Sequence, residues 1–184
     1  MMARNGRDHG GGLDAAVAQY GGKRSNWLDL STGINPKPYA IPTLEPSSWK
    51  NLPDYKADAA LCAAAREFWN VPDCADILAV PGCSSAIAQI PSLQPASFVE
   101  VATRTYNEHA AAFFFHGWDT QAYHTSPQAR VIVHPNNPTG EFHPKITAAR
   151  LTVIDESFCD IAPEKSHVAK AALPGHILLK SFGK

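Results

Sequence analysis

The sequence lacks an excess of charge of either sign. Its 184 residues carry 16 lysines and arginines against 17 aspartates and glutamates. Nucleic-acid-binding domains usually show a basic patch, so no nucleic-acid partner is predicted. No apolar run approaches the roughly 20 residues of a membrane-spanning helix, and residues 1–12 are too polar for a secretory signal. We therefore expect a cytoplasmic protein with no membrane partner.

Cysteine pairs at metal-binding spacing are also missing. The four cysteines form no Cys-x-x-Cys pair, which is typical of reduced thiols in a cytosolic protein. The eight histidines are scattered, and no two have the i, i+4 spacing of a helical zinc site. No metal site is therefore predicted from Cys62, Cys74, Cys83, Cys159, His9, His109, His116, His124, His134, His143, His167 and His176.

Apolar periodicity and turn residues divide the chain into alternating segments. Residues 1–57 read as an arm, with a helix at 13–20, a short strand at 27–30 and an extended proline-rich connection from 37 to 53. Asp58 is expected to cap a helix that ends at Trp69. Further strands are predicted at 77–80, 97–102, 118–124, 130–134, 151–155 and 177–179, with helices at 86–93 and up to 115.

This alternation predicts an α/β fold for residues 58–184. We expect a mostly parallel sheet with helices on both faces and the functional site at the carboxyl ends of the strands. Only ten residues separate Gly140 from Leu151. A parallel crossover usually takes roughly a dozen residues or more, so this connection is barely long enough for a helical crossover.

Polar residues follow or end three of the predicted strands, in the order Asn, Asp and Lys along the chain. Asn137 follows the first strand, Asp155 ends the next, and the last leads into Ser181 and Lys184. These motifs, HPNNPTG, LTVIDESFCD and HILLKSFGK, resemble those of fold-type-I aminotransferases, which bind pyridoxal phosphate (PLP). Other stretches are similar to the threonine-phosphate decarboxylases of cobalamin biosynthesis. They are HGG at 9–11, WLDLSTGINPKPY at 27–39, VPGCSSAI at 80–87, TYNEHAAA at 105–112 and SFGK at 181–184.

The resemblance implies roles for named residues in binding PLP. Lys184 would carry the cofactor covalently and move a proton, and Asp155 would face the ring nitrogen. Tyr106 would stack on the ring and Asn137 would donate to its 3-oxygen. The cofactor phosphate would lie against Gly82, Cys83, Ser84 and Ser181.

The substrate contacts and two other assignments keep alternatives open. The resemblance implies that His9 reaches a substrate phosphate, that Asn35 is held toward the substrate carboxylate and that Asn137 is also part of the substrate site. The alternative for His9 is an exposed residue near a terminus, and the alternative for Asn35 is a turn residue. Asp155 has a rival interpretation as a helix cap. Ser-x-x-Lys is also the acylation motif of penicillin-binding enzymes, yet their S-D-N and K-T-G elements do not occur here.

The function implied is decarboxylation of L-threonine O-3-phosphate to (R)-1-aminopropan-2-yl phosphate. The alternatives are a histidinol-phosphate-type aminotransferase or a non-catalytic fragment of such an enzyme. Relatives of this kind continue beyond the lysine into a small C-terminal domain, so we expect that domain to be missing and the 184-residue chain to be incomplete and inactive alone. Family members use the arm at 37–53 to cross to a second subunit, which implies a homodimer for the complete protein.

Overall fold

The computed structural model describes residues 10–120 and 125–182, so the predictions for His9 and Lys184 lie outside the described residues. The chain divides into two compact units, residues 1–37 and 38–184, which are described separately. The domain boundary expected at residue 57 stays a prediction. Within the described residues, no helix is long and apolar enough to cross a membrane.

The first unit contains helix α1 (Leu13–Tyr20) and the 3-10 turn η1 (Arg24–Asn26). Gly21 follows α1 with a φ of 78° and returns its N–H to Val17 O, as the glycine-terminated pattern predicted. The strand expected at 27–30 is wrong, because these residues are irregular. Asp29 instead accepts hydrogen bonds from both the N–H and the hydroxyl of Ser31, a local bond that competes with sheet pairing.

The second unit begins with two helices, α2 (Ser47–Lys50) and α3 (Tyr55–Trp69). The cap expected at Asp58 is wrong: Asp54 has extended backbone and its carboxylate accepts from the N–H groups of Lys56 and Ala57, at 3.0 and 3.1 Å. Asp58 lies in the first turn.

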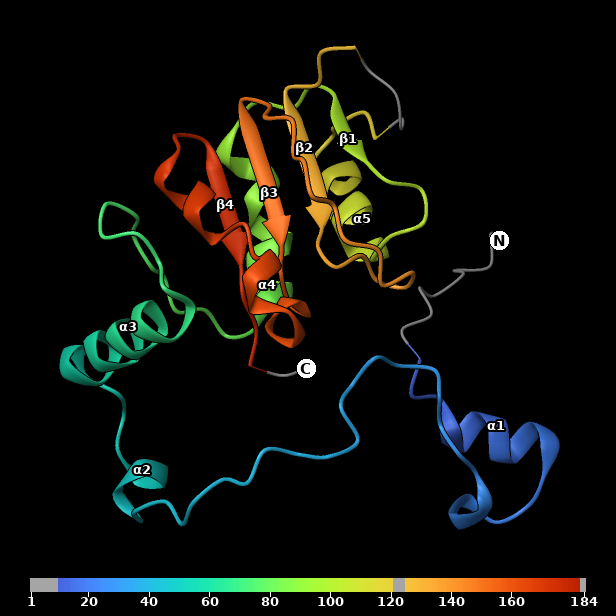
Figure 1. Cartoon of the computed structure of the whole chain (residues 1–184). Coiled ribbons are helices and arrows are strands. Elements are labelled where there is room, and N and C mark those ends of the chain that lie inside the picture. The colour runs from blue at the N-terminus through green and yellow to red at the C-terminus, as the bar shows by residue number, and fades with distance from the viewer. Residues whose placement is uncertain (1–9, 121–124, 183–184) are drawn as a thin grey trace. The chain divides into compact units, whose positions relative to one another are not determined.

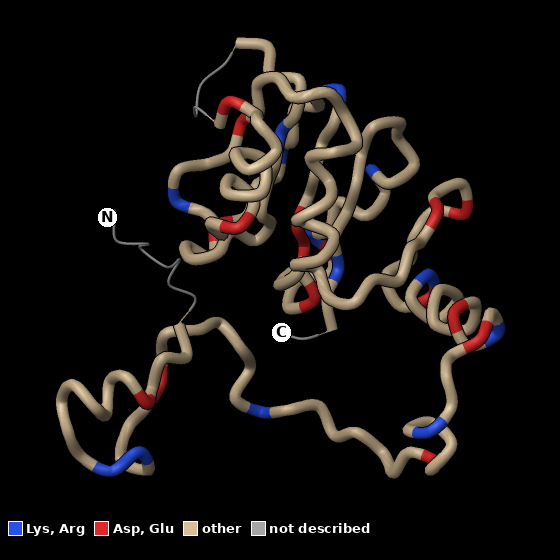
Figure 2. The backbone as a smooth tube through the Cα atoms, turned by 180° about the vertical axis from the view of Figure 1, so that it is seen from behind, with Lys and Arg blue, Asp and Glu red and all other residues tan. Residues whose placement is uncertain are grey.

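Within residues 38–184, Lys and Arg are scattered among Asp and Glu along the backbone (Figure 2).

A four-stranded parallel sheet forms the centre of this unit, as predicted. Its order is β1-β2-β3-β4, with β1 and β4 at its edges (Figure 1). The strands β2 and β3 lie within one residue of their predicted bounds because each is a short apolar run. The bounds are β1 (Val99–Val101), β2 (Ala129–Val133), β3 (Leu151–Asp155) and β4 (His176–Leu179).

Two helices cover one face of the sheet: α4 (Cys83–Gln89), which continues as η2 (Ile90–Leu93), and α5 (Asn107–Phe115) (Figure 1). The helix predicted at 86–93 thus begins earlier and changes to 3-10 geometry where Pro91 supplies no N–H. The core between helices and sheet consists of Ile87, Ile90, Val99, Val101, Phe113, Trp118, Ala129, Val131, Leu151, Val153 and Leu179.

The connection from 141 to 150 runs across the other face and contains no helix (Figure 1). Buried Thr152 of β3 bonds both backbone groups of Ala149, at 2.9 and 3.2 Å. Arg130 of β2 pairs with Glu100 at 2.7 Å and donates to Thr147 O. The chain between β3 and β4 adds η3 (Cys159–Ile161), η4 (Pro163–Lys165) and η5 (Val168–Ala172).

One further strand prediction is wrong, and another is tested only in part. Residues 77–80 are irregular and find no ladder partner among the described residues. At 118–124 the described part supplies one isolated bridge, Phe98 to Asp119, while residues 121–124 lie outside it. Apolar runs of this length predict burial, but whether a run joins the sheet depends on a neighbouring edge.

His134, directly after β2, predicts how stability depends on pH. Burial lowers its pKa; Lys165 O accepts from Nε2 at 2.9 Å, and Nδ1 accepts from the His143 N–H at 3.0 Å. The unfolded chain therefore binds the proton first, and the free energy of unfolding should fall as pH drops below about 6.5, by at most about 1.4 kcal/mol per pH unit. Urea unfolding between pH 8 and 5 measures this.

The variant His134→Gln should flatten the pH dependence in that window. The matched control is His116→Gln, which changes a histidine that bonds Ala88 O on the helical face of the sheet. A slope in His134→Gln equal to that of the parent would contradict the assignment.

Candidate active site

The carboxyl ends of three adjacent strands meet at one edge of the sheet. Val133 of β2 pairs with Asp155 of β3, which pairs with Leu179 of β4. The next residues along the chain include Asn137 after β2 and Ser181 after β4. The fold therefore brings together the segments that the sequence singled out, in the order Asn137, Asp155 and Ser181.

Asp155 is the most deeply placed of these residues, with 3% of its surface exposed. Its Oδ2 lies 2.8 Å from His109 Nε2, and its Oδ1 accepts from the N–H and hydroxyl of Ser157, at 3.0 and 2.7 Å. Burial works to raise the pKa of this carboxyl, but the hydrogen bonds and the charge interaction hold the pKa below its ordinary value. The group is thus an ionised, buried carboxylate and not an exposed helix cap.

His109 is the site residue that sequence reasoning missed. It lies in the first turn of α5, is 1% exposed, and must carry its proton on Nε2 because an ionised carboxylate only accepts. Tyr106, predicted to stack on the cofactor, packs edge-on against it with ring centroids 6.1 Å apart. The available signal was the Tyr-x-x-His spacing, which places both rings on one side of a helix start.

The loop predicted to hold the cofactor phosphate lies next to the end of β4. Cys83 Sγ is 3.1 Å from Lys180 O, the residue before Ser181. Gly82 has a φ of 87°, a left-handed conformation that favours glycine, and its carbonyl accepts from Ser85 Oγ at 2.7 Å. Ser84 is exposed at the first turn of α4. The phosphate-binding roles of Gly82, Cys83 and Ser84 stay predictions.

The two asparagines after β2 have different surroundings. Buried Asn136 donates to Arg104 O and Thr139 Oγ1 and accepts from Thr105 Oγ1, at 2.9, 2.8 and 2.6 Å. These bonds fix the turn. Asn137 is half-buried, and none of the described residues hydrogen-bonds its side chain. Its amide therefore remains available to a ligand.

Two predicted substrate residues are not placed at this edge. Asn35 lies in the first unit, where its Oδ1 accepts from the Lys37 N–H at 2.9 Å, which is the turn chemistry of the alternative interpretation. His9 lies outside the described residues, as does Lys184.

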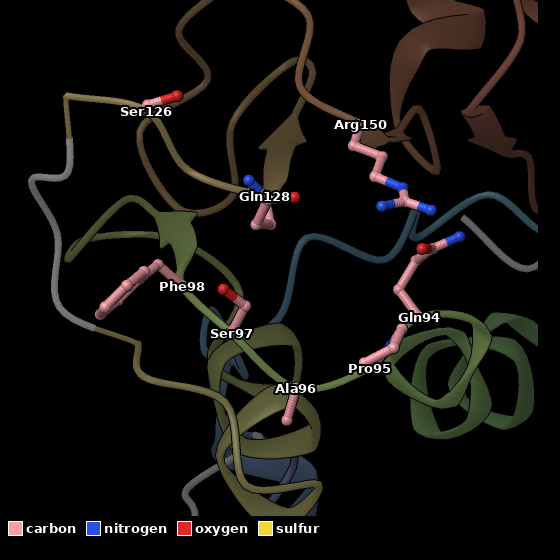
Figure 3. Close-up of a pocket in the computed structure, with 8 residues that line it drawn as sticks. All are labelled: Gln94, Pro95, Ala96, Ser97, Phe98, Ser126, Gln128 and Arg150. Carbon is pink, nitrogen blue, oxygen red and sulfur yellow. The ribbon is translucent and has the colours of Figure 1, made fainter.

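A pocket of about 440 Å³ lies at the opposite, amino ends of the strands (Figure 3). Its polar side chains come from residues just before β1, β2 and β3, including Ser97, Gln128 and Arg150. In parallel α/β sheets ligands bind outside the carboxyl ends of the strands. This pocket is therefore not the site that the polar strand ends indicate.

One buried cluster has metal-binding residue types: His134, Glu156 and Cys159 place ligand atoms within 4.8 Å of one another. Both nitrogens of His134 are already hydrogen-bonded, and Glu156 is paired with Lys180. Burial raises the pKa of the Cys159 thiol to about 11, which disfavours the thiolate that a metal requires. These bonds argue against a metal there.

Comparison with solved structures defines the type of fold. The fold matches a candidate histidinol-phosphate aminotransferase from Erwinia carotovora atroseptica with a TM-score of 0.62 and 18% identity, over 75% of this chain and 50% of that one. A histidinol-phosphate aminotransferase from Sinorhizobium meliloti, solved with pyridoxal-5'-phosphate, matches with a TM-score of 0.54 and 19% identity, over 69% and 43%. The chain thus has an aminotransferase-type α/β fold.

Sequence relatives are more specific. A threonine-phosphate decarboxylase from Sinorhizobium sp is 36% identical over 194 residues, and one from Pseudomonas aeruginosa is 35% identical over 195. Each alignment covers 96% of this chain but only 58% and 57% of the relative. No protein-family model matches the chain. The chain is a relative of the threonine-phosphate decarboxylases, which confirms the predicted resemblance.

The contact between His109 and Asp155 predicts a strong coupling in stability. His109→Ala should lower the free energy of unfolding by about 2 to 4 kcal/mol, because it removes a donor from a buried charge and leaves a cavity. The same change at His116, the residue directly after this helix, should cost less. Chemical denaturation at pH 7 measures both.

A double-mutant cycle with Asp155→Asn isolates the pair. We expect a coupling energy of at least about 1 kcal/mol. Strictly additive effects would show that the 2.8 Å contact carries no interaction free energy.

Proposed function

We propose that this chain forms the PLP-binding part of a threonine-phosphate decarboxylase. The reaction would convert L-threonine O-3-phosphate to (R)-1-aminopropan-2-yl phosphate, a step of cobalamin biosynthesis, in the cytoplasm. The observation that carries the proposal is the ionised carboxylate of Asp155, buried at the carboxyl end of a central parallel strand. Sequence identity of 35 to 36% with two threonine-phosphate decarboxylases supports it.

The hydrogen bonds around Asp155 leave its carboxylate able to accept one more, from a protonated pyridine nitrogen. An ionised carboxylate has about four acceptor positions. His109 Nε2 and the two donors of Ser157 occupy three of them. One position is left for a ring N–H, and the low pKa of Asp155 ensures that the carboxylate accepts that proton's hydrogen bond and does not compete for the proton.

Each neighbouring residue has one task in this arrangement. Asp155 keeps the ring nitrogen protonated, and His109 and Ser157 orient Asp155. Tyr106 supplies an aromatic face, worth about 0.5 to 1.5 kcal/mol beyond its burial. The Asn137 amide donates to a ring oxygen. When bound, the cofactor draws electrons from the substrate α-carbon.

Phosphate binding and proton transfer fall to the two flanking segments. Cys83 and Ser84 would provide backbone N–H groups and the Ser84 hydroxyl for the cofactor phosphate, and Ser181 would add a second hydroxyl. Gly82 would shape the turn of this loop, because its own N–H already donates to Val80 O at 2.7 Å. Lys184 holds the cofactor and returns a proton to the α-carbon after carbon dioxide leaves. The substrate is a small phosphorylated amino acid.

A homodimer is part of the proposal. The segment leading into α3 and the start of that helix expose large apolar side chains, among them Tyr39, Leu52 and Tyr55 at 87%, 92% and 95%. Apolar side chains exposed to this degree along one segment are typical of an interaction surface.

Covalent fixation tests the cofactor assignment. Adding PLP and then borohydride should attach the cofactor to Lys184, and peptide mass spectrometry should find it there. Lys184→Ala should abolish the attachment, whereas Lys170→Ala should not. Attachment at Lys170 or Lys180 would show that the site lysine is misassigned.

Product analysis separates the proposed reaction from its alternatives. With threonine phosphate we expect carbon dioxide without any oxo-acid acceptor, and Asp155→Ala should lower turnover by at least about a hundredfold while some PLP stays bound. Amino transfer that needs an oxo acid would favour the histidinol-phosphate-type alternative. PLP binding without turnover of either kind would favour the non-catalytic alternative.

A further inference from the structure

A second buried carboxylate lies directly after Asp155, and the proposed reaction does not use it. The Glu156 side chain is fully buried, and its Oε2 lies 2.7 Å from Lys180 Nζ, whose side chain is 11% exposed. The same carboxylate accepts from Ser166 Oγ and from the His167 N–H, both at 2.6 Å. Glu156 therefore joins the end of β3, the chain between η4 and η5, and the end of β4.

Lys180 connects three segments of the candidate site. Its side chain binds Glu156, the neighbour of Asp155, while its backbone carbonyl lies 3.1 Å from Cys83 Sγ at the start of α4. The next residue in the chain is Ser181. Lys180 thus contacts the residue after β3 and the start of α4, and it directly precedes Ser181.

An aromatic contact supports the same turn from outside. Phe182 stacks on Trp69 with ring centroids 4.8 Å apart and planes at 23°. Trp69 Nε1 donates to Asp160 at 3.0 Å, and Asp160 lies 3.6 Å from Lys180 Nζ. The Lys180 ammonium is also 5.8 Å from the centre of the Trp69 ring. Both side chains that flank Ser181 therefore contact Trp69.

We propose that Lys180 is a positioning residue that, through Glu156 and Cys83, sets where the Ser181 turn lies relative to Asp155. The physical reason is that a fully buried carboxylate needs its cation, so Lys180 has one strongly favoured placement. This placement fixes the backbone of the next residues. The link to catalysis rests on the proposed function, because Lys184 matters only if it carries the cofactor, but the positioning is a property of the chain without cofactor.

The same contacts distinguish Lys180 from a lysine that carries a cofactor. Lys180 Nζ is enclosed by Glu156, Asp160 and the Trp69 ring, so its ammonium is engaged inside the protein. A lysine that holds a cofactor must present a free amine. Lys180 therefore acts through the turn and not on the cofactor.

The experiment compares Lys180→Met, which keeps the length and removes the charge, with Lys180→Arg, which keeps the charge. The control is Lys170→Met, a lysine of η5. Hydrogen exchange of the cofactor-free chain is followed at residues 177–182, with β1 as the internal reference. We expect exchange at 180–182 and the thiol reactivity of Cys83 to rise about tenfold in Lys180→Met, with β1 unchanged. Lys180→Arg should stay within about twofold of the parent.

The double variant Glu156→Gln/Lys180→Met separates positioning from stability. Removing both charges should restore thermal stability, because no buried charge is left unpaired. The turn should nevertheless stay mobile, and the fraction of PLP that borohydride fixes on Lys184 should stay low in both Met-containing variants but be restored in Lys180→Arg.

Each outcome decides one of the two ideas. If the parent fixes no PLP on Lys184, the proposed function fails, while hydrogen exchange still decides the role of Lys180. Exchange at 180–182 and Cys83 reactivity unchanged in Lys180→Met would overturn the inference. So would a double variant in which turn mobility and PLP fixation both return to parental values, because the pair would then serve stability alone.

Discussion

The burial of the Asp155 carboxylate is the constraint on which the rest of the site depends. A charge in the protein interior is tolerated only where donors satisfy it. Ser157 lies two residues further along the chain, but His109 comes from α5, 46 residues earlier. An ionised carboxylate at the end of β3 therefore requires that α5 packs on the sheet, because only then does His109 reach Asp155.

Two consecutive buried carboxylates end the same strand, and they face different partners. Asp155 bonds His109 on the side of α5, whereas Glu156 bonds Lys180 and the chain that leads to β4. Successive residues of an extended chain point to opposite sides. The Asp155 carboxylate therefore faces the candidate site, and the Glu156 carboxylate faces the segments between β3 and β4. The two carboxylates bond different donors.

The short connection between β2 and β3 contributes to the packing of the strands whose carboxyl ends form the candidate site. The connection across the second face has only ten residues and no helix, and Arg130 and Thr152 bond it to β2 and β3. These contacts cover β3, all of whose residues are buried. The chain spans somewhat more than half the length of its decarboxylase relatives, yet it contains the strand ends that bring Asn137, Asp155 and Ser181 together.

The sequence by itself determined where three of the four sheet strands lie and in what order their polar ends occur. The apolar runs at β2, β3 and β4 predicted those strands to within a residue, and the N-P-x-G, D-E-S-F and S-F-G-K motifs indicated the relatives. The runs at 27–30 and 77–80 misled, because Ser31 satisfies Asp29 locally and no strand pairs with 77–80 in the described structure. A local pattern of apolar residues cannot show whether a strand of the sheet has a free edge with which the segment can pair.

Only the tertiary structure decided which groups satisfy the buried charges. Neither His109 beside Asp155 nor Lys180 beside Glu156 follows from spacing, since the partners lie 46 and 24 residues apart in sequence. Hydropathy reports the tendency of a segment to leave water, which is a local property. A hydrogen bond or an ion pair needs two atoms within about 3 Å, and folding alone brings such distant residues that close.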